Sequence, residues 1–336
     1  MSNELPWADR GLTPVTVIAG GHEAAVLAAR LALGLRDGVC PEQVAVVAEA
    51  PAPESVGEIA WCVVRPVEGA RTEGCECCRV RLDLVGAIRL VLERPTPPQR
   101  VLVVASESSD VSTIAQTLLS EPAMQRLVDL DGVVVTVDAV AQATRVALGL
   151  PFDDEMGLAR LAVADRVLVS RADDVTDDAL GTVMRSLRTI NRFGFIAAPA
   201  LSPIDMSAIV DLRAWHGAPP LGSDRMVEPV VVADGTRWPV TGRCEMDGVC
   251  EADAVDEWFN HLIAQHGSRI LRLQGAVAVD GHEHRVCCRG VRSFAISHSE
   301  TEHRADERSP LSIVAVVGYG LDADAVRAEF EATRAR

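Results

Sequence analysis

The sequence contains no lysine, so all 32 of its basic residues are arginines. Against them stand 48 Asp and Glu residues, which give a formal net charge of −16 at pH 7. A field of that sign repels phosphate backbones and anionic membrane surfaces. The composition therefore argues against direct wrapping of nucleic acid and against binding to a membrane, and it favours basic proteins as macromolecular partners.

Long apolar runs are also missing. No stretch approaches the roughly 18 apolar residues that a membrane-spanning helix needs, and the first residues, MSNELPWADRGLTPV, lack the order of a signal peptide. We therefore expect a cytoplasmic protein. Thiols stay reduced in that compartment, so the nine irregularly spaced cysteines indicate metal binding or burial and not a disulfide framework.

Strand and helix patterns alternate through the first 200 or so residues. Short valine-rich runs, apolar on both faces, predict buried parallel strands, and amphipathic stretches between them predict helices. The predicted strands are 15–19, 43–47, 100–105, 132–137 and 166–169, and the predicted helices include 82–93, 112–128 and 177–190. This alternation is typical of an α/β domain with a doubly wound, mostly parallel sheet.

A second, smaller domain follows a stretch rich in proline and glycine. Its predicted elements are a helix at 253–265, strands at 269–279, 285–296 and 311–317, and a final helix from residue 322. They form an α+β domain of ordinary size. We expect one domain at 1–212, a connection at 213–248 and the second domain at 249–336.

The segment EGCECCRVRLDLV, residues 73–85, places Cys75, Cys77 and Cys78 within four positions. Thiolates suit Zn²⁺ or Cu(I), and a closed tetrahedral zinc site needs a fourth ligand. The candidates for that ligand are Cys62, a carboxylate among Glu49, Glu54 and Glu58, and His22. The alternatives to metal binding are simple packing of small buried thiols and redox chemistry at the spacing of Cys75 and Cys78.

Two weaker clusters lie near the C-terminus. His282, His284, Cys287 and Cys288 could supply part of a second metal site, or they could form a hairpin with exposed histidines and one buried cysteine. For Cys244 and Cys250 we expect packing.

These segments, taken in order, resemble the CobW-type P-loop GTPases, a family that includes zinc metallochaperones. The matching pieces are PVTVIAGG, GCECCRVRLDL for the family's GCxCCxxRxDL block, IAQTLL, LDGVVVTVDA, ADRVLVSRADDV, ILRLQGAVAVDG and VVGYGLDADAV. The resemblance implies a P-loop GTPase-like domain followed by a small CobW C-terminal domain. It also implies Zn²⁺ at the cysteine block.

The nucleotide machinery departs from the family pattern. A P-loop reads GxxxxGK[ST], in which Lys neutralises the β- and γ-phosphates and Ser or Thr binds Mg²⁺. Counted from Gly20, this chain has Ala25, Val26 and Leu27 at the last three positions. Because the chain has no lysine, it cannot supply a substitute from elsewhere.

Gly20, Gly21, Asp138 and Asp173 remain as a vestigial nucleotide site. Asp138 stands where a Walker B carboxylate would hold Mg²⁺, although an Asp there can also cap a helix. Asp173 stays in the base-recognition loop, whose Asn and Lys have become Ser170 and Arg171, and it fits a surface turn equally. We expect doubtful GTP and Mg²⁺ binding and little or no hydrolysis, so no residue is assigned a catalytic role.

Two functions follow from the resemblance. In the first, the protein is a pseudo-GTPase, and zinc at the cysteine block sets a state that a partner protein reads. One zinc-starvation member of the family recruits a hibernation factor to ribosomes, so the partner by analogy is the ribosome or its basic proteins. In the second, the protein is a GTP-dependent zinc metallochaperone that delivers metal to a client protein.

Overall fold

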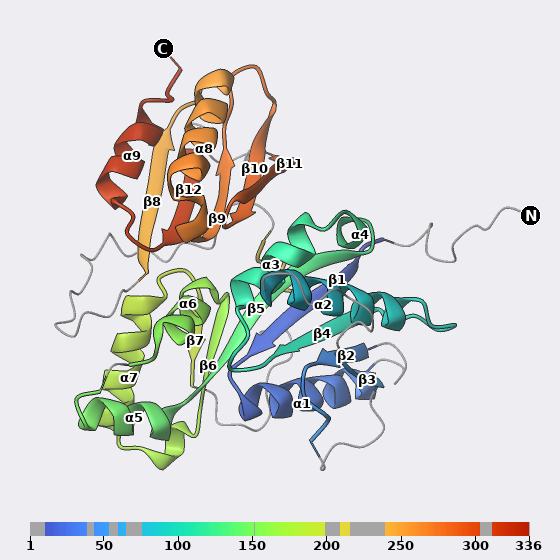
Figure 1. The fold of residues 1–336 in the computed structure, drawn as a ribbon. Helices are drawn as coiled ribbons and strands as arrows, with labels where there is room; N and C mark the ends of the chain where they lie inside the picture. Colours follow the sequence, from blue (N-terminus) through green and yellow to red (C-terminus); the bar gives the residue numbers. More distant parts are fainter. Residues whose placement is uncertain are drawn as a thin grey trace, which may run out of the picture.

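Two β-sheets organise the chain, one in each half of the sequence (Figure 1). The computed structural model describes residues 11–38, 44–53, 60–64, 76–150, 152–198, 209–215, 239–302 and 311–335. The seven strands of the N-terminal sheet are all parallel and lie in the order β3-β2-β4-β1-β5-β6-β7. They are β1 Thr13–Ala19, β2 Val44–Ala48, β3 Ala60–Val63, β4 Arg100–Ala105, β5 Val128–Asp138, β6 Arg166–Ser170 and β7 Phe195–Ala197.

Helices cover both faces of this sheet. They are α1 His22–Gly38, α2 Glu76–Leu92, α3 Val111–Ser120, α4 Pro122–Gln125, α5 Ala139–Ala147, α6 Glu155–Val163 and α7 Asp177–Ile190. Leu27 and Leu31 of α1 pack on one face, whereas Ile88 of α2 and Ile114 of α3 pack on the other. Strands β2 and β4 are buried along their whole length, as runs that are apolar on both faces should be. The predicted doubly wound parallel sheet is confirmed.

Three details of this half differ from the prediction. Strands β3 and β7, with four and three residues, were not predicted, because both are short edge strands that are only partly buried. The predicted helix 112–128 is divided, because Pro122 has no N–H with which to continue α3 and instead begins α4. Its last predicted residue, Val128, already belongs to β5.

The C-terminal sheet is antiparallel and has the order β11-β10-β9-β12-β8. Its elements are β8 Val240–Asp247, α8 Ala252–His266, β9 Ile270–Val277, β10 His284–Val291, β11 Phe294–Glu302, β12 Leu311–Gly318 and α9 Ala323–Glu331. Helices α8 and α9 share a buried core with the sheet, in which the rings of Trp258 and Phe330 lie 4.9 Å apart between centroids. The predicted α+β domain is present.

This sheet has five strands where three were predicted. Strand β8 lies inside the predicted connection 213–248 and pairs with β12. The predicted strand 285–296 is two strands, β10 and β11, joined by a turn at Arg292 and Ser293. Arg292 takes the left-handed conformation, with φ of 54°, and no Asn-Gly or similar pair marked the turn in the sequence.

Arg272 of β9 joins the two halves of the chain. Its Nη1 lies 2.6 Å from Oδ1 of Asp165 and also donates to the carbonyl of Val163 at 2.9 Å, and both charged side chains are at most 4% exposed. Its Nη2 donates to the carbonyl of Ala214, and the guanidinium carbon lies 4.2 Å from the ring centroid of Trp215. The buried Arg272 guanidinium is thus paired with a carboxylate, two carbonyls and an aromatic ring, and these contacts connect the C-terminal sheet to the first domain.

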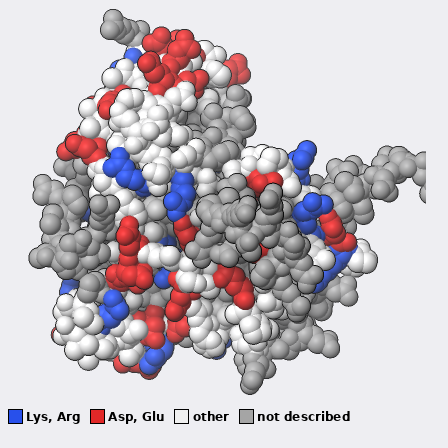
Figure 2. Space-filling view, in the orientation of Figure 1, with Lys and Arg blue, Asp and Glu red and all other residues white. Residues whose placement is uncertain are grey.

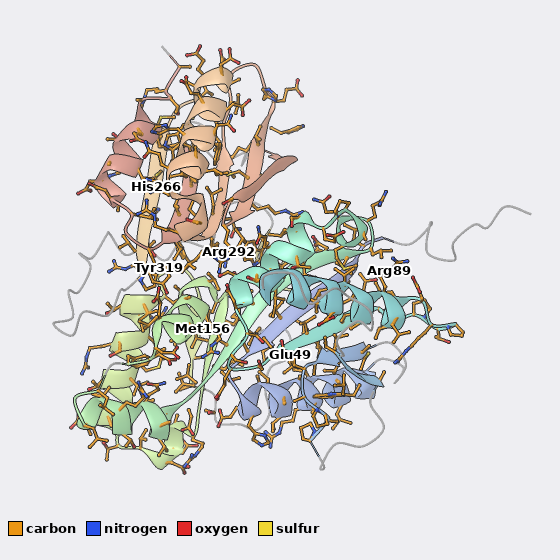
Figure 3. All side chains as sticks on the ribbon, in the orientation of Figure 1. Glu49, Arg89, Met156, His266, Arg292 and Tyr319 are labelled. Atoms are coloured by element: carbon orange, nitrogen blue, oxygen red, sulfur yellow. The ribbon has the colours of Figure 1, made fainter. Side chains whose placement is uncertain are left out.

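Three further contacts between described residues lie in this interface, which we call the domain seam. Arg292 forms an ion pair with Asp110 at the start of α3. Tyr319 donates to the carbonyl of Glu155 at 2.8 Å, and Arg289 lies 3.5 Å from Asp129. Arg292 and Tyr319 both lie where the C-terminal domain meets the first domain (Figure 3).

Acidic side chains gather in patches over both domains, with single arginines between them (Figure 2). Among the described residues, no helix combines the length and the apolar character that crossing a membrane requires.

Candidate functional site

The vestigial nucleotide loop, residues Gly20 to Leu27, connects β1 to α1. Gly20 and Gly21 have φ of 128° and 67°, which favour glycine. A Cβ on Gly20 would lie 2.4 Å from the backbone oxygen of Thr136 in β5. Ala25 and Leu27, at positions that would bind phosphate and Mg²⁺, instead belong to the buried core beneath α1. Packing therefore accounts for the retained Gly20 and for the leucine at the Ser/Thr position of the motif.

Carboxylates of the chain itself surround this loop. Oε1 of Glu107 lies 2.2 Å from the point where a Gly21 Cβ would be. The carboxylate of Glu23 accepts a hydrogen bond from Ser170, the residue that replaces the Asn of the base-recognition loop. Negative side chains at these positions oppose the approach of a polyphosphate.

Arg171 ties the remaining vestigial residues together. Its Nη1 lies 3.0 Å from Oδ2 of Asp138, and its Nε lies 3.0 Å from Oδ2 of Asp174. The ion pairs with Asp174 and Asp138 raise the pKa of the Arg171 guanidinium. The same Asp138 caps α5, accepting from the N–H groups of Val140 and Ala141 at 2.8 and 3.2 Å.

Asp173 is exposed on a single 3₁₀ turn at Ala172–Asp174. Asp138 is thus engaged by a helix end and by an arginine, and the chain offers no hydroxyl at Leu27 to complete a magnesium site. The described residues of this loop do not fit a magnesium nucleotide.

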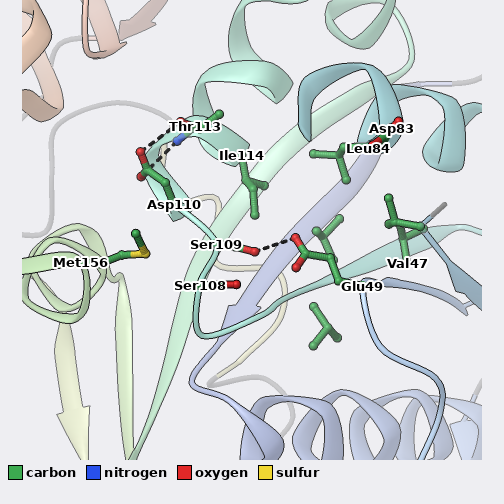
Figure 4. Close-up of a pocket in the computed structure, with 13 residues that line it drawn as sticks. Val47, Glu49, Asp83, Leu84, Ser108, Ser109, Asp110, Thr113, Ile114 and Met156 are labelled. Carbon is green, nitrogen blue, oxygen red and sulfur yellow. Dashed lines mark hydrogen bonds between the residues drawn. The ribbon is translucent and has the colours of Figure 1, made fainter. Parts of the chain in front are cut away.

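A cavity of about 450 Å³, which we call the Glu49 cavity, opens at the carboxyl ends of β2 and β4 (Figure 4). Ligands of open α/β sheets commonly bind at such an edge. Its wall is mostly apolar and includes Val47, Val103 and Leu84. The polar groups in the wall are Glu49, Asp83, Ser108, Ser109, Asp110 and Thr113, and Met156 of α6 lies at one side. Oε1 of Glu49 accepts from Oγ of Ser109 at 2.6 Å.

The predicted metal ligands fall into three groups: those that lie outside the described residues, those on the face of the sheet that α2 covers, and His22 on the opposite face. Cys75, Glu54 and Glu58 lie outside the described residues, as do the side chains of Cys77 and Cys78. The backbone of Cys77 and Cys78 forms the first turn of α2. At a rise of about 1.5 Å per residue, this turn is about 9 Å along the helix from Asp83 in the cavity wall. The first turn of α2 and Glu49 thus lie at the same edge of the sheet.

Cys62 and Glu49 lie on the face of the sheet that α2 covers. Cys62 pairs with Val47 and packs, half-buried, against the core below α2. His22 is exposed at the start of α1, the helix on the opposite face. A carboxylate and a thiol beside a helix that begins with two cysteines are a donor set suited to zinc. Within the described ranges, no three His, Cys, Asp or Glu side chains converge on one point.

The cysteines of the C-terminal domain lie in its interior. Cys244, Cys250, Cys287 and Cys288 are all buried, whereas one buried cysteine of the last pair had been expected. The register shift at this point skips a residue of β11, whereas β10 keeps an unbroken register with β9. The two cysteines therefore lie on opposite faces of the sheet: Cys288 packs in the core with α8 and α9, and Cys287 is buried on the other face. His282 is exposed. Burial raises the pKa of Cys244 to about 12 and raises the pKa of Cys288 as well.

We predict that iodoacetamide at pH 8 modifies Cys62 in the native protein but spares these four cysteines, because Cys62 is only half-buried whereas the other four are buried away from the reagent. Mass spectrometry after brief labelling checks this, and labelling in guanidinium is the control in which all four must react. Modification of Cys288 without denaturant would contradict the burial.

The buried thiol of Cys244 also makes stability depend on pH. Because its pKa in the folded state exceeds its pKa in the unfolded state, its contribution to stability is present below about pH 8.5 and declines toward about pH 12.

Sequence reasoning missed the residues that close the vestigial loop and support Glu49. Glu107, Ser109 and Asp110 follow β4 in the segment SESSD, and the only sequence signal there was an Asp suited to cap α3. Arg171 had been noted only as the replacement for a lysine. Its pairing with Asp138 depends on the path of two loops, which no local pattern specifies.

Comparison with known proteins places these features in a family. Residues 69–194 match the family described as CobW/HypB/UreG, nucleotide-binding domain. Residues 241–334 match the Cobalamin synthesis protein cobW C-terminal domain. The Zinc chaperone YjiA of Escherichia coli is 22% identical over 78% of this chain and 81% of its own length.

The Zinc-regulated GTPase metalloprotein activator 1 of Schizosaccharomyces pombe is 23% identical over 44% of this chain, and that match spans 35% of the yeast protein. The crystal structure of Zn(II)-bound YjiA GTPase from E. coli superposes with a TM-score of 0.68 at 18% identity, covering 97% of this chain and 100% of that chain. A Zn(II)-bound triple mutant of YjiA, with one Glu and two consecutive Cys changed to Ala, superposes with a TM-score of 0.67. With both of its domains matched in order and the fold shared throughout, this chain belongs to the CobW family.

Proposed function

We propose that this protein is a zinc-responsive pseudo-GTPase, in which the cysteine block binds Zn²⁺ and a partner protein reads the resulting state. The observation that carries the proposal is the ion pair between Arg171 and Asp138. The residue at the former base-recognition lysine neutralises the former magnesium carboxylate, so the nucleotide site is satisfied by its own side chains. Glu23 and Glu107 add negative charge beside the same loop.

Zinc is supported by the relatives and by the donors present. Two relatives are named for zinc, and the YjiA structures are Zn(II)-bound. The Glu and two consecutive Cys changed in the YjiA triple mutant are the residue types of Glu49, Cys77 and Cys78 here. That mutant is itself described as Zn(II)-bound, so those three positions do not account for all the zinc that YjiA binds. Stoichiometry is therefore the quantity to measure.

The partner that the surface favours is basic. A net charge of −16 and acidic patches on both domains attract cationic protein surfaces and repel bare RNA. Ribosomal proteins are one such class, so we extend the proposal to a ribosome-associated role in the cytoplasm when zinc is scarce.

The test is a pair of titrations of the reduced, metal-free protein. We expect no heat and no fluorescence change with Mg-GTP up to about 1 mM, a concentration at which even weak binding would register. We also expect about one tight zinc ion per chain in competition with a chelator, which the Cys75→Ser/Cys77→Ser/Cys78→Ser variant loses. Replacing Cys287 and Cys288 by Ala is the control, because it removes two thiols from the other domain.

Each outcome decides a part of the proposal. Micromolar GTP binding would overturn the pseudo-GTPase assignment and favour a GTP-dependent zinc metallochaperone that delivers metal to a client. Unchanged zinc stoichiometry in the triple Ser variant would overturn the metal assignment of the cysteine block. In the expected case, pull-down with and without zinc then identifies the partner.

A further inference from the structure

Ser109 connects Glu49 to the loop that follows β4. Its side chain is 7% exposed, and its hydroxyl donates to Oε1 of Glu49 at 2.6 Å. The same hydroxyl lies 2.7 Å from Oγ of Ser106, and the N–H of Ser109 donates to the carbonyl of Ser106 at 3.1 Å. The loop is thus closed on itself and delivers one hydroxyl to Glu49. Within the described part of the chain, Oε2 of Glu49 accepts no hydrogen bond, which leaves it for a ligand in the cavity.

Asp110 fixes the other end of this loop. Its carboxylate caps α3 through the N–H groups of Ser112 at 2.9 Å and Thr113 at 3.4 Å. The same carboxylate pairs with Arg292, at the turn between β10 and β11 of the C-terminal domain. Asp110 also lines the Glu49 cavity, beside the residue that orients Glu49. One five-residue loop therefore reaches from the cavity to the domain seam.

A second contact reaches the same cavity from the same domain. Tyr319 donates to the carbonyl of Glu155, the residue before Met156 in the cavity wall. In the cavity wall, Asp110 itself contacts the C-terminal domain, and Met156 follows a residue that does (Figure 3). The remaining wall residues belong to the first domain.

We propose that Ser109 and Arg292 are positioning residues for zinc at Glu49. Ser109 orients the carboxylate, and Arg292 holds the loop from the C-terminal domain, so that zinc occupancy and the domain seam are linked. This inference rests on the proposed zinc function and adds a route by which zinc occupancy is transmitted to the C-terminal domain.

The physical basis is the behaviour of groups that hydrogen-bond to metal ligands. Removing such a partner typically weakens metal binding about 10–100-fold, because the ligand loses its orientation. Coupling between two sites is also reciprocal: if the Arg292 contact favours zinc at Glu49, then zinc favours the Arg292 contact by the same factor. Zinc should therefore tighten the domain seam at the turn between β10 and β11.

The test measures zinc affinity by chelator competition in the full-length chain. We expect Ser109→Ala to weaken binding about 10–100-fold, with Ser109→Thr restoring most of it, and Arg292→Ala to weaken it about fivefold or more. The double variant should bind no more weakly than Ser109→Ala alone, because both residues act through one loop. Arg269→Ala is the matched control, since this exposed arginine contacts only its own domain.

Two further readouts separate positioning from general damage. The visible absorption of Co²⁺ bound in place of zinc should change in Ser109→Ala and be recovered in Ser109→Thr. Hydrogen exchange at residues 289–292 should slow when zinc binds to the wild-type protein, and not in Ser109→Ala. If Arg292→Ala is unstable, Arg292→Lys keeps the charge at the seam and should bind zinc more tightly than Arg292→Gln.

The outcomes distinguish this inference from the proposed function. If the cysteine block binds zinc with unchanged affinity in Ser109→Ala and Arg292→Ala, the positioning role is wrong and the zinc function stands. If the wild-type chain binds no zinc at the block, the proposed function fails and this inference fails with it.

Discussion

Replacing Arg272 by alanine is expected to lower the free energy of unfolding by about 3–5 kcal/mol, the usual cost of removing one partner of a buried ion pair. The carboxylate of Asp165 would stay 2% exposed and lose its charged partner. The carbonyl of Val163 would lose the donor it has in Arg272, and that of Ala214 would keep only the hydrogen bond from Gln274. Urea denaturation followed by circular dichroism measures the change.

The matched control is Arg334→Ala, which removes an exposed arginine from the same domain and should change stability by less than about 0.5 kcal/mol. A combined Arg272→Met and Asp165→Asn variant should be less damaged than the sum of its parts, because neither charge is then left alone. If Arg272→Ala proves as mild as the control, the two domains are not held together by this ion pair.

Replacing Gly20 by alanine is the second change with a large expected effect, about 3–5 kcal/mol of destabilisation, from an unfavourable backbone region and an overpacked contact together. Its φ of 128° suits glycine, and the new methyl group would meet the carbonyl oxygen of Thr136 at 2.4 Å. That oxygen belongs to β5 in the middle of the sheet and cannot rotate away. Thermal and urea unfolding measure the loss.

Gly21→Ala is the informative comparison. Its φ of 67° costs an alanine about 1–2 kcal/mol, and its close contact is the end of the Glu107 side chain, which can turn aside. We therefore expect Gly21→Ala to be clearly milder than Gly20→Ala. Equal losses would show that the carbonyl of Thr136 does not dictate the glycine at position 20.

Sequence patterns predicted the long buried elements well and the edges poorly. Strand β4 begins and ends where its valine run does, because a strand buried on both faces must be apolar throughout. Strand β3 is intermediate in burial at all four residues, so its composition carries no such signal. Strand β8 alternates between buried and exposed positions but lies in a region whose proline and glycine content indicated a connection.

The candidate site was predictable only where topology alone brings residues together. The carboxyl ends of parallel strands meet at one edge, which is why Gly20 and Asp138 lie at the same edge of the sheet, as the motifs implied. The contacts of Ser109 with Glu49 and of Arg171 with Asp138 depend on loop paths and rotamers that no periodicity encodes. These two contacts, which the sequence does not reveal, fix the orientation of the Glu49 and Asp138 carboxylates.

The pairing of Arg171 with Asp138 has an evolutionary consequence. A lysine restored at position 26 would belong to a loop that already has the carboxylates of Glu23 and Glu107 around it, and these would compete with phosphate for its charge. Asp138 would still be engaged by Arg171, and residue 27 would still have to leave the core and become a hydroxyl. Under the proposed pseudo-GTPase function, we expect none of these substitutions alone to restore nucleotide binding, so that reversion would require several changes at once. Further divergence from the GTPase relatives would then be easier than a return to them.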